Sequence, residues 1–125
     1  MKYAFLLLHM VVLQACAAPS TCGDSGSQHE MTSCARDRLT NLELELDKKH
    51  EALSEIMGGY HLEKAILAWE NYRDAHCTST SSIYEGGSLQ EYAVAVCKAE
   101  LTRRRLESLD DDYRDTLDII TQGSP

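Results

Sequence analysis

The stretch that decides the fold runs from Trp69 to Cys97 and reads WENYRDAHCTSTSSIYEGGSLQEYAVAVC. It holds the end of one helical segment, a loop rich in serine and threonine, and the start of a second helical segment. The glycine pair at 86–87 breaks the helical pattern, because glycine permits backbone conformations that other residues avoid. A disulfide between Cys77 and Cys97 would fix how the two helices meet across the loop.

Helical periodicity continues on both sides of this stretch. Ser27 opens an S-x-x-E capping box, and a first helix is predicted from there to the glycine pair at 58–59. A second helix is predicted over residues 61–76, and a third starts at a second capping box, Ser88-Leu89-Gln90-Glu91. Residues spaced by three or four positions mark the buried faces. These residues are Met31, Ala35, Leu39, Leu42, Leu46, Leu53, Met57, Leu62, Ala65, Ile66, Trp69, Tyr72 or Arg73, Leu89, Tyr92, Val96, Leu101, Leu106, Leu109, Tyr113 and Leu117.

The pattern predicts an all-α fold, a three-helix disulfide-stapled bundle with two long helices and one shorter helix. No alternating strand pattern of useful length is present, and both prolines lie near the ends of the chain. We expect a signal peptide over 1–15, an N-terminal arm over 16–26, one helical domain over 27–120 and a tail over 121–125. A core of this size is small, so disulfides are a sensible supplement to it.

The N-terminal residues predict export. Lys2 is the only charge before an apolar run over residues 3–13, which is shorter than the roughly 20 residues of a membrane span. The segment Leu13-Gln14-Ala15-Cys16 has the form of a lipobox, whereas Ala15-Cys16-Ala17 fits ordinary signal cleavage. We favour the lipobox, in which Cys16 is acylated. The protein would then be periplasmic or on the cell envelope, and bound to the membrane only through this lipid.

The cysteine count agrees with an oxidising compartment. Of five cysteines, Cys16 is set aside by either form of processing, which leaves Cys22, Cys34, Cys77 and Cys97. Four cysteines allow three pairings. The sequence order favours Cys22–Cys34 and Cys77–Cys97, since each pair brackets one predicted turn. A zinc site is disfavoured because the chain has no C-x-x-C spacing.

The charge narrows the choice of partner. The chain has 125 residues and a formal net charge of −8, and loss of residues 1–15 removes only Lys2, giving −9 (−8 − 1). This acidity argues against nucleic acid, whose binding proteins are basic. It favours solubility and a cationic protein partner.

No residue pattern indicates catalysis. The histidines after residue 16 lack H-x-x-x-H spacing, and the aspartates over 110–118 lack the glycine and terminal glutamate of a calcium loop. The glycine pair at 86–87 is not part of a phosphate-binding loop. We therefore predict no enzyme activity, no metal and no cofactor.

The loop is the best candidate for recognition, because binding residues concentrate on loops held by a rigid scaffold. Ile83 and Tyr84 form an apolar pair beside the carboxylate of Glu85. These three residues are the candidate partner-binding residues; the alternative is that Ile83 and Tyr84 fold back to cover the helix ends. Trp69 is predicted to be a core residue, and Arg73 is predicted to pair with a carboxylate, either Glu100 or Asp74.

Several segments together resemble a known family. They are Cys22, Gln28-x-Glu30-Met31-x-x-Cys34-Ala35, Trp69-x-x-Tyr72-Arg73-Asp74-x-x-Cys77, Glu85-Gly86-Gly87-Ser88, Cys97 and Leu101-Thr102-x-x-Arg105-x-x-x-Leu109. With them the chain resembles the LprI-like lysozyme inhibitor family of secreted bacterial domains. The first helix departs from the pattern, because Leu46-Asp47-Lys48-Lys49-His50 stands where members often show Leu-Asn-x-x-Tyr.

The resemblance implies a helical, disulfide-bonded envelope protein that binds and sterically blocks lysozyme or a related peptidoglycan-cleaving enzyme. The alternative is a non-inhibitory structural or adaptor module that binds another periplasmic protein through a helix face, since a shared fold does not transfer function. Both readings predict an acidic protein with a protein partner.

Overall fold

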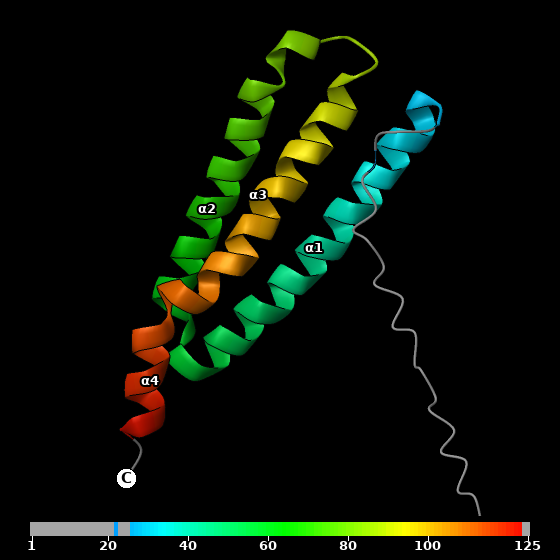
Figure 1. The fold of residues 1–125 in the computed structure, drawn as a ribbon. Coiled ribbons are helices and arrows are strands. Elements are labelled where there is room, and N and C mark those ends of the chain that lie inside the picture. Colours follow the sequence, from blue (N-terminus) through cyan, green and yellow to red (C-terminus); the bar gives the residue numbers. More distant parts are fainter. Residues whose placement is uncertain (1–21, 23–25, 124–125) are drawn as a thin grey trace, which may run out of the picture.

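The computed structural model describes residue 22 and residues 26–123; Cys16 and the predicted signal peptide lie outside the described residues. The helices are α1 (Gln28–Met57), α2 (Gly59–Thr80), α3 (Gln90–Asp112) and α4 (Arg114–Gln122), with a 3-10 turn, η1 (Ser82–Tyr84), between α2 and α3. Figure 1 shows α1, α2 and α3 running lengthwise beside one another, with α4 beyond the end of α3. The all-α prediction is confirmed for the described residues, but the count is not: three helices are long, and a short fourth follows them.

The first predicted capping box is present. The Ser27 backbone N–H donates to Glu30 Oε2 at 2.6 Å, and the Glu30 N–H donates to Ser27 Oγ at 3.4 Å. The Ser27 backbone N–H and hydroxyl both donate to Glu30 Oε2, and these two bonds lower the pKa of Glu30, because they favour its charged form. At the other end of α1, Gly58 has a φ of +77°, a left-handed value that favours glycine. The chain can therefore reverse directly from α1 into α2.

The second predicted capping box is wrong. Helix α3 begins at Gln90, its N-cap position is Leu89, and no side chain caps it. Ser88 Oγ instead donates to Gln28 Oε1 at 3.0 Å, and Gln28 Nε2 donates to the Ser88 carbonyl. Ser88 therefore pairs with a residue 60 positions away and does not cap α3.

The predicted boundaries of the second and third helices also need correction. Helix α2 continues through Thr80, so Cys77 lies within it. The predicted third helix is interrupted at Tyr113, which separates α3 from α4. Residues 110–112 are all aspartate, a weak helix former whose charge opposes the dipole at a helix C-terminus. Asp115, by contrast, lies in the first turn of α4, where that charge is favourable.

Large apolar side chains concentrate at one end of the bundle, which we call the core end. The buried cluster is Leu46, Leu53, Leu62 and Leu109, and the partly buried side chains packed on it are Met57, Ile66, Trp69, Leu106, Tyr113 and Leu117. These come from all four helices. Of the two alternatives on α2, Arg73 is buried and Tyr72 is exposed.

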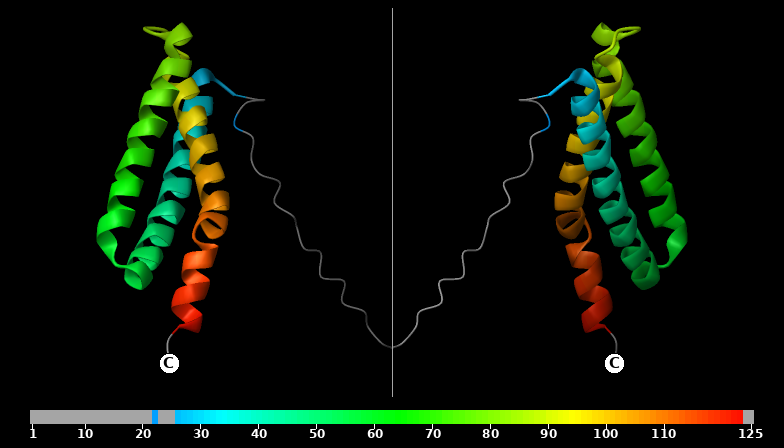
Figure 2. Two further views of the ribbon diagram at one scale, coloured as in Figure 1. Left: turned by 90° about the vertical axis from the view of Figure 1, so that its left-hand side faces the viewer. Right: turned by 90° about the vertical axis from the view of Figure 1, so that its right-hand side faces the viewer.

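The opposite end, which we call the braced end, is packed with small residues. Helix α3 packs mainly against α1, and the buried residues there include Thr32, Ala35, Ala95 and Ala99. The two disulfides lie at this end: Cys22–Cys34, with a Cα–Cα distance of 5.7 Å, and Cys77–Cys97, with a distance of 5.6 Å. Figure 2 shows the starts of α1 and α3 and the loop gathered at this end, away from α4.

Two residues predicted to be buried on the third helix are not. Leu89 is 40% exposed and Val96 is 38% exposed. Both lie at the braced end, beyond the large apolar cluster. None of the helices in residues 26–123 is long and apolar enough to cross a membrane.

Candidate functional site

The loop between α2 and α3 is hydrogen-bonded to itself at successive turns. The Tyr84 N–H donates to the Ser81 carbonyl at 3.0 Å, and the Gly87 N–H donates to the Tyr84 carbonyl at 2.9 Å. Gly86 has a φ of +72°, which favours glycine at the tightest point. The Gly86 N–H also donates to Gln90 Oε1 at 3.0 Å. The loop is thus built from fixed turns and tied to the start of α3.

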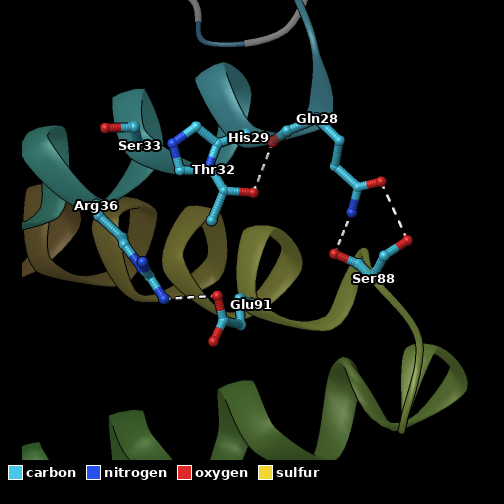
Figure 3. A pocket seen from close by; sticks show the side chains of 7 residues that line it. All are labelled: Gln28, His29, Thr32, Ser33, Arg36, Ser88 and Glu91. Atoms are coloured by element: carbon cyan, nitrogen blue, oxygen red, sulfur yellow. Dashed lines mark hydrogen bonds and ion pairs between the residues drawn. The ribbon is translucent and has the colours of Figure 1, made fainter.

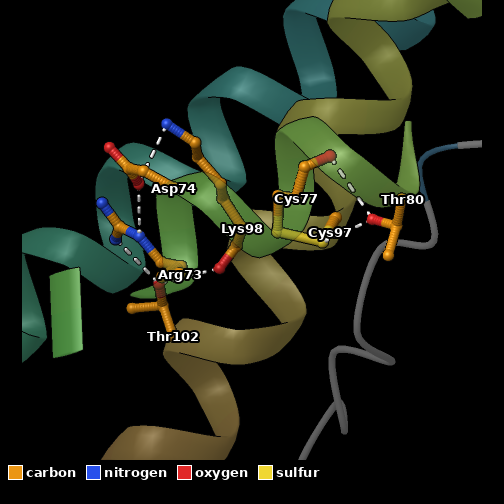
Figure 4. Close-up of a disulfide and its surroundings, with 7 residues drawn as sticks. All are labelled: Arg73, Asp74, Cys77, Thr80, Cys97, Lys98 and Thr102. Carbon is orange, nitrogen blue, oxygen red and sulfur yellow. Dashed lines mark hydrogen bonds and ion pairs between the residues drawn. A yellow bond between two sulfur atoms is a disulfide. The ribbon is translucent and has the colours of Figure 1, made fainter. Parts of the chain in front are cut away.

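The Cys77–Cys97 disulfide closes the base of this loop. Figure 4 shows the bridge joining α2 to α3, with Thr80 beside it. Cys77 is fully buried, and the Thr80 hydroxyl donates to its carbonyl at 3.3 Å while lying 3.7 Å from Cys97 Sγ. The loop therefore leaves a covalently fixed pair of helices.

The three predicted recognition residues lie together at the tip of the loop. Ile83 is 80% exposed and Tyr84 is 39% exposed. Glu85 is also exposed, and it has no ion pair within the described residues. Of the two residues in the fold-back alternative, Ile83 does not cover the helix ends, whereas Tyr84 is partly covered and lies beside Leu89. The tip thus presents an apolar side chain to solvent next to a carboxylate in sequence.

A groove of about 400 Å³ adjoins the loop. Tyr84 and Leu89 form part of its wall, and α3 supplies the floor. The residues that line it are Thr80, Ser81, Tyr84, Leu89, Tyr92, Ala93, Val96 and Cys97. Sequence reasoning missed this groove, because it assigned Leu89 and Val96 to the core. No signal in the sequence pointed to it, because the S-x-x-E pattern places the cap at Ser88 and Leu89 inside the helix.

Tyr92 connects the groove to the second disulfide. Its hydroxyl donates to the Cys22 carbonyl at 2.6 Å, and Cys22 is bonded to Cys34 on α1. Tyr92 also lines a smaller cavity with Ala35 and Ala99. The groove floor is therefore held from both sides, through α2 by one bridge and through the N-terminal arm by the other.

A polar pocket of about 260 Å³ lies where α1 begins, beside the start of α3. Figure 3 shows the two polar contacts that cross it, the hydrogen-bonded Gln28–Ser88 pair and an ion pair between Arg36 and Glu91 at 2.5 Å. His29, Thr32 and Ser33 complete the lining. The polar groups of these two pairs satisfy each other, so this pocket is best understood as a fastening of α1 to the loop.

Arg73 is a structural residue. Its guanidinium lies 3.0 Å from Glu43 Oε1 and 3.1 Å from Asp74 Oδ1, and it donates to Thr102 Oγ1 at 3.1 Å. The side chain is only 10% exposed, which leaves little of it for a partner. Burial raises the pKa of Asp74, but hydrogen bonds from Lys98 and Arg73 outweigh it and lower that pKa overall. Arg73 thus links all three long helices.

Of the two predicted partners of Arg73, Asp74 is confirmed and Glu100 is wrong. Glu100 binds Arg103 at 2.7 Å and Arg104 at 2.9 Å on its own helix. Hydrogen bonds from these two arginines lower the pKa of Glu100 to about 2. Glu43, which sequence reasoning missed, lies on α1 and faces Arg73 across the bundle.

Trp69 packs on the apolar cluster of the core end and has two arginines near its ring. The guanidinium carbons of Arg73 and Arg105 lie 5.3 Å and 6.0 Å from its ring centroid. His50 is 6% exposed. Burial and the charge of Arg105 lower the pKa of His50, while Asp47 opposes them. These residues form the interior of the bundle, away from the loop. Within the described part of the chain, no group of three metal-binding side chains is placed to hold an ion.

These features define a class: a small, acidic, all-α domain with two disulfides and an exposed apolar tip at its braced end. The family model described as "Lysozyme inhibitor LprI" matches residues 18–109. The chain therefore belongs to the LprI lysozyme inhibitor family, a family of secreted or periplasmic inhibitors with no known catalytic activity.

One relative among curated proteins is an uncharacterized protein of Rhizobium meliloti (strain 1021). It is 30% identical over 121 residues, an alignment that covers 78% of this chain and 87% of the relative. No solved structure matches the chain. The family match indicates a protein partner such as lysozyme.

Proposed function

We propose that this protein is an exported inhibitor that binds a lysozyme and blocks its substrate cleft with the tip formed by Ile83, Tyr84 and Glu85. The family match supplies the class of target. The observation that supports this tip is the 80% exposure of Ile83 on a loop whose base is closed by Cys77–Cys97. An inhibitor of this kind acts by occupying the cleft, so it needs no catalytic group of its own.

The construction of the loop favours tight binding. A loop that is already fixed loses little conformational entropy when it is bound. The internal hydrogen bonds at Tyr84 and Gly87 hold the tip in one shape before a partner arrives. Burial of an exposed isoleucine and a half-exposed tyrosine then contributes apolar contact energy.

The charge of the molecule favours a cationic target. The whole chain carries −8, and such a field speeds the encounter with a positively charged enzyme. Glu85 places one carboxylate at the tip, where it can meet a lysine or arginine at the rim of the cleft. Inhibition should therefore weaken as ionic strength rises.

We also propose that Cys16 is acylated and anchors the inhibitor to the cell envelope. The lipobox-like Leu13-Gln14-Ala15-Cys16 supports this. Mass spectrometry of protein from the membrane fraction tests it directly. An acylated N-terminal cysteine is expected, whereas a mature chain that begins at Ala18 would show ordinary secretion.

The test of inhibition uses the purified, oxidised mature protein and a C-type lysozyme that lyses cell walls. We expect inhibition at micromolar protein or below. Loss of both inhibition and binding at that concentration would remove this function for that target.

A second experiment locates the site. The double variant Tyr84→Ala/Glu85→Ala should raise the inhibition constant at least about tenfold, as is typical when central contacts of an interface are lost. The matched control is Tyr60→Ala/Glu63→Ala, a tyrosine and a glutamate exposed at the start of α2. The control should change the constant less than about twofold.

The rival is an adaptor that binds an envelope protein through a helix face. The exposed side chains of Tyr60 and Leu67 on α2 favour it, at 64% and 52% exposure. If the control variant above lost binding and the tip variant kept it, the adaptor surface on α2 would replace the tip.

A further inference from the structure

Leu89 lies at a position where a leucine does little to stabilise the fold. It immediately precedes α3, at the N-cap position, and no side chain caps the helix. Serine, threonine, asparagine or aspartate is usual there, because each accepts a hydrogen bond from a free helix N–H. Leu89 cannot do so, and it leaves 40% of its surface in water. Departures from local rules of this kind are expected where a residue serves binding.

Leu89 is part of a continuous apolar surface. Ile83, Tyr84, Leu89 and Val96 are four exposed large apolar residues at the braced end. Tyr84, Leu89 and Val96 line the groove of about 400 Å³ described above, and Tyr84 belongs to both the groove and the proposed tip. The groove and the tip are therefore adjoining parts of one surface.

We infer that this groove receives an apolar side chain of the bound enzyme, flanked on the enzyme by a lysine or arginine. The inference rests on the proposed function and names a second contact region for it. The tip enters the enzyme's cleft, while a projecting part of the enzyme's surface enters the groove. Tyr84 contacts the enzyme on both of its faces.

Charge identifies the occupant as a cationic protein. Two copies of this chain, each with a formal charge of −8, repel one another as they approach. A cationic enzyme is attracted instead. Glu85 lies next to the groove wall in sequence and has no ion pair within the described residues, so it can pair with the cation beside the inserted side chain.

The experiment places opposite charges in the groove. Val96 lies on α3 and is 38% exposed, so Val96→Arg and Val96→Glu should both fold. Leu67→Arg and Leu67→Glu, on the outer surface of α2 at 52% exposure, are the matched controls. Circular dichroism and the melting temperature of each variant establish that it is folded before inhibition of a C-type lysozyme is measured.

We expect Val96→Arg to raise the inhibition constant at least about tenfold, because it blocks the groove and repels a cationic enzyme. Val96→Glu should raise it several-fold less than Val96→Arg. The Leu67 variants should stay within about twofold of wild type. A second groove variant, Leu89→Ser, should also weaken inhibition. If Val96→Arg does not fold, Leu89→Ser tests the groove in its place.

The other outcomes separate the two proposals. No inhibition by wild type would overturn both. Inhibition that is unchanged in Val96→Arg and in Leu89→Ser would overturn the groove alone. Equal losses in the two Val96 variants would overturn the cationic occupant. A wild-type dimer in light scattering that Val96→Arg converts to monomer would show that a second copy fills the groove.

Discussion

The two ends of the bundle are stabilised by different means. At the core end, leucines from α1, α2 and α3 form a buried cluster that Trp69 and residues of α4 partly cover. At the braced end, small residues such as Ala35, Ala95 and Ala99 let α1 and α3 approach closely. Two disulfides and the Gln28–Ser88 pair then hold that end together.

The difference shows how a small domain can keep apolar residues free for binding. A cluster of large side chains needs those side chains inside, whereas a disulfide stabilises without them. The braced end therefore leaves Ile83, Tyr84, Leu89 and Val96 on its surface. Because the covalent links limit motion at this end, we expect these residues to be held in place before a partner binds.

The largest effect on stability is expected at the core end. Leu109 is fully buried, and Leu109→Ala should lower the free energy of unfolding by about 2–5 kcal/mol, because it removes apolar contacts and leaves a cavity. Urea denaturation measures this loss. The folded fraction should still inhibit lysozyme normally. A loss below about 1 kcal/mol would show that the leucine cluster is not the main source of stability at this end.

Removal of the Cys77–Cys97 bridge should have the next largest effect. The bridge spans 20 positions, and a closed loop of that length contributes about 3 kcal/mol. Cys77→Ser/Cys97→Ser should lower the free energy of unfolding by that order and also weaken inhibition. Hydrogen exchange should speed up in η1 and in the first turns of α3, while residues around Leu109 keep their protection when compared at equal fractions folded. Unchanged inhibition by the folded variant would separate the bridge from the binding surface.

A smaller loss of about 0.5–1.5 kcal/mol is expected for Ser88→Ala, the usual contribution of one hydrogen bond. The variant removes the Ser88 Oγ bond to Gln28 but leaves the carbonyl of residue 88 as an acceptor for the Gln28 amide. Ser82→Ala is the control, because Ser82 is exposed and its side chain has no hydrogen bond within the described residues. Threonine can also cap a helix, so Ser88→Thr would be as stable as wild type if Ser88 were a helix cap. In the observed geometry its larger side chain should give a stability between those of wild type and Ser88→Ala.

The smallest expected effect is a dependence of the free energy of unfolding on pH, which arises at the core end. Burial and Arg105 lower the pKa of His50, so the unfolded chain binds a proton at a higher pH than the folded one. The stability contributed by neutral His50 is complete above the unfolded pKa of about 6.5 and is lost as the pH falls below it. In His50→Tyr this loss should be absent, and unfolding curves at pH 7.5 and pH 5 measure the difference. An identical change with pH in both proteins would contradict the assignment to His50.

The fold was predictable from features that act over short distances. The spacing of apolar residues and the cap at Ser27 depend on neighbours within one or two turns, and the structure has both. The disulfide pairs followed from their positions around predicted turns. These signals are local, so they can be detected in a single sequence.

What the sequence did not reveal depends on contacts between distant residues. The S-x-x-E pattern assigns Ser88 to a helix cap, but in the structure Ser88 pairs with Gln28, which lies 60 positions away. Glu43, the partner of Arg73 on α1, is likewise distant in sequence, and no local pattern predicts that pair. Helical spacing placed Leu89 and Val96 on an apolar face, but spacing cannot tell whether another helix covers that face. The groove followed only from the arrangement of η1, α2 and α3.

The most direct measurement is an NMR map of the inhibitor's amide signals as a C-type lysozyme is added. If the braced end is the binding surface, signals from residues 80–97 should shift or broaden, and those of α4 and of the turn between α1 and α2 should not. Changes centred on residues 56–67, with the loop unaffected, would contradict the assignment and place the interface at the core end.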